Sequence, residues 1–332
     1  MANEIYRRGR KNLNGYKNNR NKLRIAATIL TIVLVVALAL VVDYSSNNNQ
    51  LTWSDLYQNS GLIEKTPDIS SDNLAVYYLD VDQSDCSILC NEDKVLMIDT
   101  GAPSEINTIR EVLQSLGITK IDYLIITHQH DDHMGCATDI LNYYEVSNII
   151  MPRLSSINMV TTKAYETLLT TIKEKNINAI AAEPGLTFNI GDAKCTVLAP
   201  LKQDENMNNM SVVTKITFGE NSFLFQGDAE KKVESAILKS GADVSADIIK
   251  IGHHGSKTST SVSYIEAVSP KIAIISCGKV NSYGHPHEVT LDTLTNKNID
   301  TYITYQTGLI SVKSDGKTIT VMNSSGVVKT YE

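Results

Sequence analysis

The longest apolar stretch of the chain lies close to its N-terminus, between Ile25 and Val42. These eighteen residues carry no charge and include only two polar side chains, Thr28 and Thr31. As a helix, the stretch would extend about 27 Å, which is close to the hydrocarbon thickness of a bilayer. A helix of a soluble protein would place polar residues along one side. We therefore predict a single transmembrane helix at residues 25–42.

The sequence on either side of this stretch predicts its orientation. Residues 1–24 contain eight Lys or Arg against one Glu, and Asp43 follows the stretch. Because basic flanks stay in the cytoplasm, we expect a cytoplasmic tail at residues 1–24 and an extracellular position for the rest of the chain. A cleaved signal peptide is the alternative, but its apolar stretch would usually be shorter, and we find no convincing small-x-small cleavage site before Tyr44. Residues 43–72 are polar and are predicted to form a stalk.

From residue 73 onward, short runs of β-branched and aromatic residues alternate with segments of helical periodicity. Gly219–Asn221 is predicted to be the turn of a hairpin, and Gly117 to end a helix. Strands and helices mixed over some 250 residues predict one α/β domain with layered sheets at residues 73–332. Strands are predicted at 75–81, 95–98, 123–127, 148–151, 194–198, 212–218, 222–226, 247–251 and 272–276. Helices are predicted at 105–116, 134–144, 165–175, 230–239 and 290–296.

Composition narrows the class of protein further. The chain has 332 residues, of which 42% are apolar, and this is enough to fill a core and excludes wholesale disorder and a collagen-like chain. The five cysteines lack zinc-ribbon spacing, and we expect buried core residues without chemistry, although Cys86 and Cys90 are close enough in sequence to pair. Residues 43–332 carry 22 basic against 36 acidic groups, a net charge of −14, which argues against broad electrostatic capture of DNA.

All seven histidines fall into three short clusters, the first of which directly follows the predicted strand 123–127. The ends of strands are where α/β folds place ligand residues. Together with Asp132, the first cluster offers four imidazole or carboxylate groups within six residues, and these groups are ligands of zinc and similar ions. Six residues cannot place all four groups on one ion without strain, so we expect two neighbouring ions. The clusters are His128, His130 and His133; His253 and His254; and His285 and His287.

Two further candidates follow predicted strands in the same way. Asp228 ends the strand 222–226, and His253 and His254 follow the strand 247–251 between two glycines. A Gly-Asp pair by itself is also typical of a turn or a helix cap. Two adjacent histidines flanked by glycines, in contrast, favour close approach of the backbone to a ligand.

These motifs resemble a known family. The segment His128-x-His130-x-Asp132-His133 resembles the signature of the metallo-β-lactamase superfamily. A longer ordered set, from about Leu74 to Val321, is similar to the hydrolase domain of ComEC-type competence (DNA-uptake) proteins. The resemblance implies a four-layer αβ/βα sandwich with a dinuclear metal site between two sheets. The set consists of Leu79-Asp80-Val81, Asp99-Thr100-Gly101, the histidine signature, Asn208-Asn209-x-Ser211, Gly227-Asp228, Gly252-His253-His254-Gly255-Ser256 and Tyr283-Gly284-His285-Pro286.

The resemblance also implies roles for single residues and a cofactor of two divalent ions, Zn²⁺ or alternatively Mn²⁺. Which of the adjacent histidines, His253 or His254, is the ligand stays open at this point. By analogy, His128 and His130 bind the first ion, Asp132, His133 and His253 bind the second, Asp228 bridges both, and Asp99 and Asn209 support the ligands from behind.

The chain departs from the family pattern at two places. The third histidine expected for the first ion near residues 205–211 is absent, and Asn206, Asn208 and Asn209 are found there. We therefore expect the first ion to be held more weakly. Asp82 and Ser84 replace glycines of the relatives, which places the tight geometry of that loop in question.

Two cations about 3.5–4 Å apart lower the pKa of a bridging water and stabilise charge on an attacked phosphoryl group. We predict that a metal-bound hydroxide near Asp132 and Asp228 attacks a phosphodiester. A histidine, His285 or His254, would contact a phosphate oxygen or protonate the leaving oxygen. The alternative for His285 is a turn residue before Pro286.

The sequence leaves three classes of function open. The first is a membrane-anchored extracellular phosphodiesterase or nuclease; the second is a hydrolase of another external substrate, such as a phosphorylated wall polymer, an amide or a lactone; the third is a non-catalytic binding module. Protein partners are not indicated. Several basic residues beside the motifs could form local phosphate-binding patches or could equally be ordinary solvated side chains: Lys250, Lys257, Lys279, Arg153 and Lys163.

Overall fold

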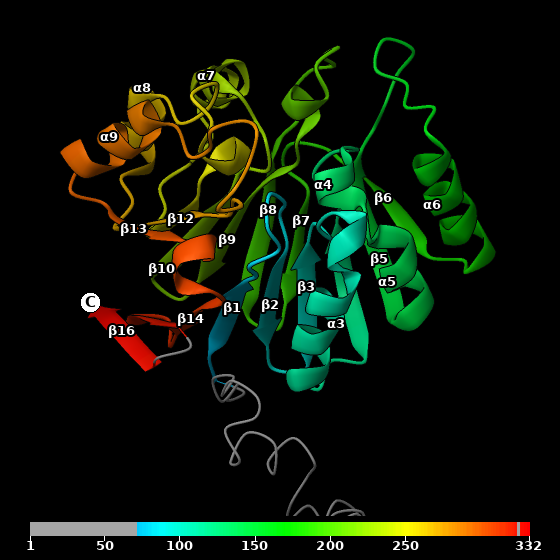
Figure 1. Ribbon diagram of the computed structural model, residues 1–332, viewed down its shortest axis with the longest axis horizontal. Coiled ribbons are helices and arrows are strands. Elements are labelled where there is room, and N and C mark those ends of the chain that lie inside the picture. The colour runs from blue at the N-terminus through cyan, green and yellow to red at the C-terminus, as the bar shows by residue number, and fades with distance from the viewer. Residues whose placement is uncertain (1–71, 324–325) are drawn as a thin grey trace, which may run out of the picture. The chain divides into compact units, whose positions relative to one another are not determined.

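The computed structural model describes residues 72–323 and 326–332 (Figure 1). The predicted cytoplasmic tail, the predicted transmembrane helix and the predicted stalk up to residue 71 lie outside these residues. Within the described ranges, no helix is both long enough and apolar enough to cross a bilayer.

One sheet is built from the first part of the described chain together with its C-terminal end. Its strands lie in the order β16-β15-β14-β1-β2-β3-β4-β5-β6. The strands from β3 to β6 run parallel to one another, whereas the other neighbours pair antiparallel. The bounds are β1 (Leu74–Tyr78), β2 (Ser87–Asn91), β3 (Lys94–Ile98), β4 (Lys120–Ile125), β5 (Glu145–Pro152), β6 (Asn178–Ala182), β14 (Ile310–Ser314), β15 (Ile319–Asn323) and β16 (Gly326–Tyr331).

The second sheet has the order β13-β12-β11-β10-β9-β8-β7. Its strands from β10 to β13 run parallel, and β7, β8, β9 and β10 pair antiparallel in sequence order. The predicted turn at Gly219 joins β9 to β10, as expected. The bounds are β7 (Thr187–Ile190), β8 (Ala193–Ala199), β9 (Val213–Phe218), β10 (Asn221–Phe225), β11 (Ile248–Lys250), β12 (Ile272–Ile275) and β13 (Asp300–Ile303).

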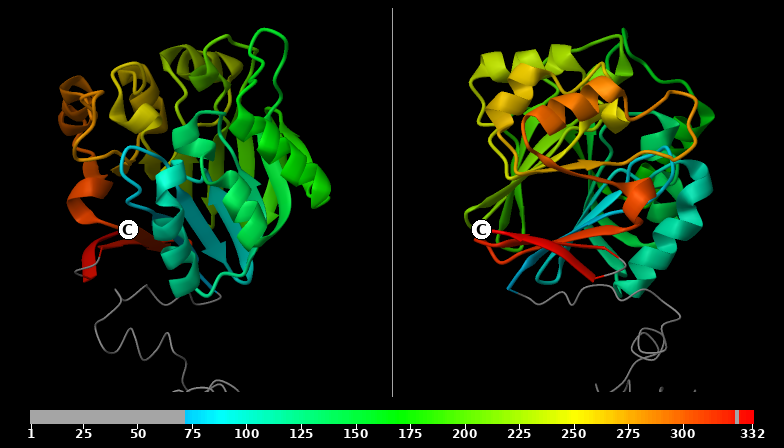
Figure 2. Two further views of the ribbon diagram at one scale, coloured as in Figure 1. Left: turned by 45° about the vertical axis from the view of Figure 1, so that its right-hand side comes forward. Right: turned by 60° about the vertical axis from the view of Figure 1, so that its left-hand side comes forward.

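Helices cover the outer face of each sheet, as Figure 1 and the turned views of Figure 2 show. The helices from α3 to α6 lie on the first sheet, and α7, α8 and α9 lie on the second. The bounds are α3 (Ile106–Ser115), α4 (Asp131–Met134), α5 (Ala137–Tyr143), α6 (Lys163–Glu174), α7 (Lys231–Ser240), α8 (Val262–Val268), α9 (Glu288–Asn296) and α10 (Thr304–Thr307). The 3₁₀ turns are η1 (Pro103–Glu105), η2 (Met207–Met210) and η3 (Gly252–Gly255).

Apolar side chains fill the interfaces between these layers. Val76 and Phe225 belong to the core between the two sheets, Ile109 to the core under the first set of helices, and Tyr264 to the core under the second. All five residues of β1 are buried, as a strand with a layer on each face requires. The sequence-based prediction of a four-layer αβ/βα sandwich with two sheets is thereby confirmed.

Two local features refine the predictions. The helix predicted at 134–144 is divided into α4 and α5, and Gly135 lies at the division. A side chain at Gly135 would come within 2.5 Å of the Pro103 ring, so glycine allows η1 to pack against this turn. All five cysteines are buried and unpaired, as expected, and this excludes a disulfide between Cys86 and Cys90.

Candidate metal centre

Parallel strands place the predicted site residues at one edge of each sheet. Asp99 follows β3 and the first histidine cluster follows β4; Asp228 follows β10, and His254 follows β11. Because β3 is parallel to β4 and β10 is parallel to β11, the loops at their carboxyl ends emerge together. This topology explains how side chains far apart in sequence come together between the sheets.

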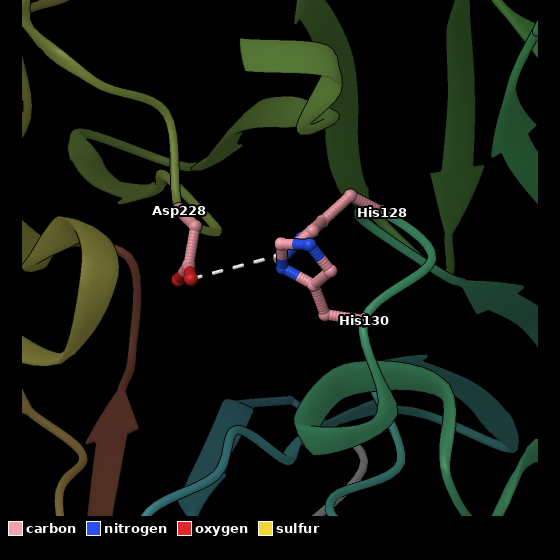
Figure 3. Close-up of side chains that lie close together, drawn as sticks. All are labelled: His128, His130 and Asp228. Carbon is pink, nitrogen blue, oxygen red and sulfur yellow. Dashed lines mark hydrogen bonds and ion pairs between the residues drawn. The ribbon is translucent and has the colours of Figure 1, made fainter. Parts of the chain in front are cut away.

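One group of candidate ligands consists of His128, His130 and Asp228, shown in Figure 3. The Nε2 atom of His128 lies 3.8 Å from Oδ2 of Asp228 and 2.9 Å from Nδ1 of His130. His128 and Asp228 are buried, whereas His130 is exposed. The three side chains therefore offer two ring nitrogens and one carboxylate oxygen to a single cation. We call them the first group.

A second group consists of Asp132, His133 and His254. Nε2 of His254 lies 3.3 Å from Oδ2 of Asp132, and Nε2 of His133 lies 3.9 Å from the same oxygen. Asp228 adjoins this group too, because its Oδ1 atom lies 3.3 Å from Nε2 of His133 and 3.8 Å from Nε2 of His254. Asp228 thus faces the first group with one carboxylate oxygen and the second group with the other.

Buried polar atoms without a hydrogen-bond partner show that these residues suit a divalent cation. Nε2 of His133, Nε2 of His254 and Oδ1 of Asp228 are buried and have no hydrogen-bond partner. Leaving such groups unsatisfied is costly, and native proteins leave few of them. Imidazole nitrogens and carboxylate oxygens are the donors that zinc and similar ions take. The cluster is therefore chemically suited to metal ions, as the sequence predicted.

The far side of each buried ring is fixed by a hydrogen bond. His133 donates from Nδ1 to Oδ2 of Asp99 over 2.8 Å. Asp99 is itself held by the backbone N–H and the hydroxyl of Thr127, both at 2.7 Å. Since that hydroxyl donates to Asp99, it can accept from Nδ1 of His128, 3.2 Å away. Nε2 of both rings therefore faces the cluster, the orientation that a metal ligand needs.

The structure distinguishes between the two adjacent histidines. Both have left-handed backbone angles, with φ of 51° at His253 and 52° at His254, and their ring centroids lie 6.2 Å apart. His254 joins Asp132 and His133, whereas His253 belongs to none of the candidate groups among the described residues. Nε2 of His253 still lies 3.7 Å from Asp228. The geometry thus favours His254 as the ligand in the position for which the resemblance implied His253.

Gly255 makes this backbone path possible. Its φ is 82°, and an added side chain would lie 2.6 Å from Pro286. The close approach expected from the flanking glycines is therefore an approach of one loop to another, and it places the loop of His285 against that of His254.

Sequence reasoning missed the role of a buried ion pair behind His254. The ammonium group of Lys250 lies 3.0 Å from Oδ2 of Asp85, and both residues are almost fully buried. Oδ1 of Asp85 lies 3.4 Å from Nδ1 of His254, which donates to the carbonyl of Ser276 over 3.1 Å. Lys250 therefore neither belongs to a surface phosphate-binding patch nor is solvated. Asp85 directly follows Ser84 in the loop that departs from the family pattern, but its burial could not be predicted from the sequence.

The position of the missing third histidine is filled by smaller polar groups. The hydroxyl of Ser211 accepts from the backbone N–H of Asp228 over 3.0 Å and lies 3.4 Å from Nδ1 of His128. Asn209 lies on η2, and its side chain contacts Asp204. That Asn209 supports the ligands stays a prediction, whereas Ser211 makes the contacts expected of such a residue.

Carboxylates of the cluster change the pKa of the rings beside them. Burial acts to lower the pKa of His254, but Asp228 and Asp85 outweigh it and raise this pKa to about 10. Asp228 and Asp99 likewise outweigh burial at His133 and hold its pKa well above the usual value. Burial, assisted by the charge of His133, holds the pKa of His128 well below its usual value. The second group therefore lies in strongly negative surroundings, which attract a cation.

His285 lies beside the cluster rather than in it. Its ring centroid is 6.2 Å from that of His254 and 5.5 Å from those of His253 and Tyr283. Burial, followed by the charges of neighbouring histidines, lowers its pKa to about 4. The ring is thus neutral at pH 7, which favours a hydrogen-bond donor over a charged acid.

Gln83 fixes which nitrogen of His285 can donate. Its Oε1 accepts from the backbone N–H of Gly278, so its amide nitrogen faces Nδ1 of His285 at 3.2 Å. Nδ1 accepts this hydrogen bond, and the ring proton therefore lies on Nε2. His285 is a positioned residue, and not merely the residue before Pro286.

The loop with the two departures from the family pattern keeps a tight geometry. Asp82 has a left-handed φ of 54°, the conformation for which glycine is favoured. Its carboxylate lies against Gly278, where any side chain would come within 2.1 Å of Oδ1. The hydroxyl of Ser84 donates to the carbonyl of Val81. The loop accommodates Asp82 because the facing residue is glycine.

Comparison with known proteins agrees with this geometry. The sequence profile of the metallo-β-lactamase superfamily matches residues 79–279, which contain both groups of candidate ligands. A solved structure of the metallo-β-lactamase fold protein YhfI from Bacillus subtilis superposes with a TM-score of 0.51. It is 10% identical in sequence and covers 73% of this chain and all of that one, so it shows likeness of fold.

Relatives named for competence and recombination are closer in sequence. ComE operon protein 3 of Bacillus subtilis is 34% identical over 202 residues, which are 60% of this chain and 26% of that protein. Recombination protein 2 of Haemophilus influenzae is 31% identical over 222 residues, 65% of this chain and 26% of its own length. This chain spans about a quarter of either relative. The resemblance to competence proteins is confirmed, and the chain belongs to the metallo-β-lactamase superfamily.

Proposed function

We propose that the protein is a metal-dependent hydrolase of phosphodiester bonds. The observation that carries the proposal is the convergence of buried, unpartnered atoms of Asp228, His133 and His254 on one point between the sheets. Side chains in this state are arranged for divalent cations rather than for one another. When bound, two such ions supply a nucleophile from water at neutral pH and stabilise negative charge on the substrate.

The residues divide into two ligand sets with one shared member. His128 and His130 would hold the first ion, and Asp132, His133 and His254 would hold the second. Asp228 would serve both sets, because its two oxygens face different groups. Zn²⁺ suits this mixture of imidazole and carboxylate, and Mn²⁺ is the alternative for a site rich in carboxylates.

His285 orients the substrate. With Nδ1 occupied by Gln83, its Nε2–H is free to donate to a phosphate oxygen or to the leaving oxygen beside His254. Donation from a neutral ring contributes binding and orientation and does not need a charged acid. Its position beside the cluster suits a substrate that is held by the metal ions on one side and by His285 on the other.

A phosphodiester in a nucleic acid is the substrate that we favour. Relatives named for competence and recombination favour such a polymer over an amide or a lactone. A phosphorylated wall polymer is the alternative external substrate. Both would bind through local contacts around the cluster, because the net charge of residues 43–332 is negative.

The test of this proposal uses the full chain, stripped of metal and then loaded with Zn²⁺ or Mn²⁺. We expect two ions per chain, turnover of bis-p-nitrophenyl phosphate and of plasmid DNA, and no turnover of nitrocefin. Asp228→Ala should lose turnover by at least about 10²–10³-fold, the range for removal of a charge-stabilising group. The matched control is Asp243→Ala, which removes an exposed carboxylate. A chain that binds no metal, or that turns over only nitrocefin, would contradict the proposal.

We further propose that residues 25–42 anchor the protein in the cell membrane with the hydrolase domain outside. The uncharged stretch and its basic N-terminal flank support this topology. The full chain should sediment with membranes after carbonate washing, and protease added to intact cells should degrade the domain. Recovery of the full chain in the soluble fraction would contradict the anchor.

A further inference from the structure

Lys250 and Asp85 form a buried ion pair beside the candidate metal centre. Both residues are at most 5% exposed, and the ammonium group also donates to the carbonyl of Ile251 over 3.2 Å. Burying two charges is expensive unless both are paired and hydrogen-bonded. Such a pair adds little stability in general, so its position beside His254 calls for another explanation.

The pair joins the two sheets at the level of the cluster. Asp85 lies in the connection between β1 and β2 of the first sheet, and Lys250 is the last residue of β11 in the second. The backbone N–H of Asp85 donates to the carbonyl of Asp132 over 3.1 Å, and its carbonyl accepts from Gly101 over 2.8 Å. Asp85 is thus fixed to the loops that carry Asp132 and Asp99.

The side chain of Asp85 reaches from these loops to His254. One carboxylate oxygen binds Lys250, and the other lies 3.4 Å from Nδ1 of His254. Asp99 faces Nδ1 of His133 from the same side but more closely, with a hydrogen bond of 2.8 Å. Lys250 compensates the charge of Asp85 in a region that already contains the carboxylates of Asp132 and Asp228.

We propose that Asp85 and Lys250 are positioning residues for His254. Asp85, together with the carbonyl of Ser276, holds the proton of His254 on Nδ1 and keeps Nε2 directed at Asp132 and Asp228. Lys250 fixes Asp85 in place and balances its charge. This inference rests on the proposed metal centre, because the orientation of His254 matters only if Nε2 binds a metal ion.

The experiment measures the affinity of the full chain for Co²⁺ and the absorption spectrum of the bound ion, which reports its coordination. For Lys250→Met we expect affinity 10–100-fold weaker than that of the unchanged chain, the usual effect of losing a ligand's supporting partner, and an altered spectrum. The matched control is Lys215→Met. Lys215 is also a largely buried lysine, 2.7 Å from Asp243, but it lies on β9 outside the cluster. Its loss should leave affinity and spectrum unchanged.

A second variant distinguishes the loss of positioning from a failure to fold. Lys250→Met alone leaves Asp85 buried without a partner, whereas Lys250→Met with Asp85→Leu removes both charges and should fold. We expect the double variant to bind Co²⁺ weakly as well, because His254 has lost its support. If either variant binds Co²⁺ as tightly as the unchanged chain and with the same spectrum, the inference is overturned. If the unchanged chain binds no Co²⁺, the metal centre itself is refuted instead.

Discussion

The two halves of the cluster differ in how firmly their ligands are held. In the second group, His133 is backed by the carboxylate of Asp99, and His254 by Asp85 and a carbonyl. In the first group, His128 is backed only by hydroxyl groups, and His130 is exposed. Ligands that are fixed beforehand lose less freedom on binding, and charged partners make a ring a better donor.

This difference teaches that a shared ligand does not make the two ion positions equivalent. Asp228 serves both groups, yet the buried charges lie almost entirely on one side. We therefore expect the second group to bind its ion more tightly than the first. The missing third histidine acts in the same direction, because Ser211 replaces a metal ligand with a hydroxyl that binds the backbone of Asp228.

Removal of both ions should have the largest effect. Binding of one ion to the folded state alone, here the tighter one, stabilises a protein by about 4 kcal/mol when the free ion is at 1,000 times its Kd. For a domain of this size that corresponds to a fall in Tm of roughly 10 °C on adding a chelator, measured by calorimetry. Chelator should lower the Tm of Asp228→Ala by clearly less, because both groups have lost their shared ligand. An equal fall in both proteins would mean that the metal effect lies elsewhere.

His130→Ala should separate the two halves. We expect the metal content to fall from two ions to one per chain, because the first group loses a ligand while the second keeps all of its own. Elemental analysis of the dialysed protein gives the content. His287→Ala removes a histidine outside both groups and should keep two ions. Loss of both ions in His130→Ala would show that the halves are not independent.

Asp99→Asn tests the support of the stronger half. The ring of His133 would lose its charged partner, so the tighter ion should bind 10–100-fold more weakly in a chelator competition. Asp122→Asn, on β4, changes another mostly buried aspartate that accepts a backbone hydrogen bond and should bind as before. If Asp99→Asn bound the ion as tightly as the unchanged chain, the charged partner behind His133 would not explain the difference between the two groups.

Ser211→Ala should have the smallest effect of the series. It removes one neutral hydrogen bond to the backbone of Asp228, worth about 1 kcal/mol, so we expect metal affinity to fall by less than tenfold. The loss should affect mainly the weaker ion in a two-step titration. A larger effect than that of Asp99→Asn would reverse the order of the two halves.

Much of the fold and the ligand loop could be predicted because the signals are local. The apolar strand before His128 and the dense cluster after it lie within a dozen residues. Helix α3 was expected from its apolar stripe, and it ends before Gly117 as predicted. The order of strands in the sheets, in contrast, depends on contacts between distant segments. The strands β14, β15 and β16 were not predicted, although they complete the first sheet beside β1.

The choice between His253 and His254 could not be predicted for a physical reason. Adjacent residues in a regular strand point to opposite faces, but here both have left-handed angles, which no sequence pattern indicated. The burial of Lys250 could not be predicted from the sequence either. A lysine next to a histidine motif suggested contact with phosphate, whereas its partner Asp85 lies 165 positions away in sequence.

The most direct test of the central claim is anomalous diffraction from crystals of the full chain grown with Zn²⁺. The account predicts two peaks between the sheets, one beside His128 and His130 and a stronger one beside His133 and His254, with Asp228 between them. A cluster without a peak, or peaks bound only by surface residues, would contradict it.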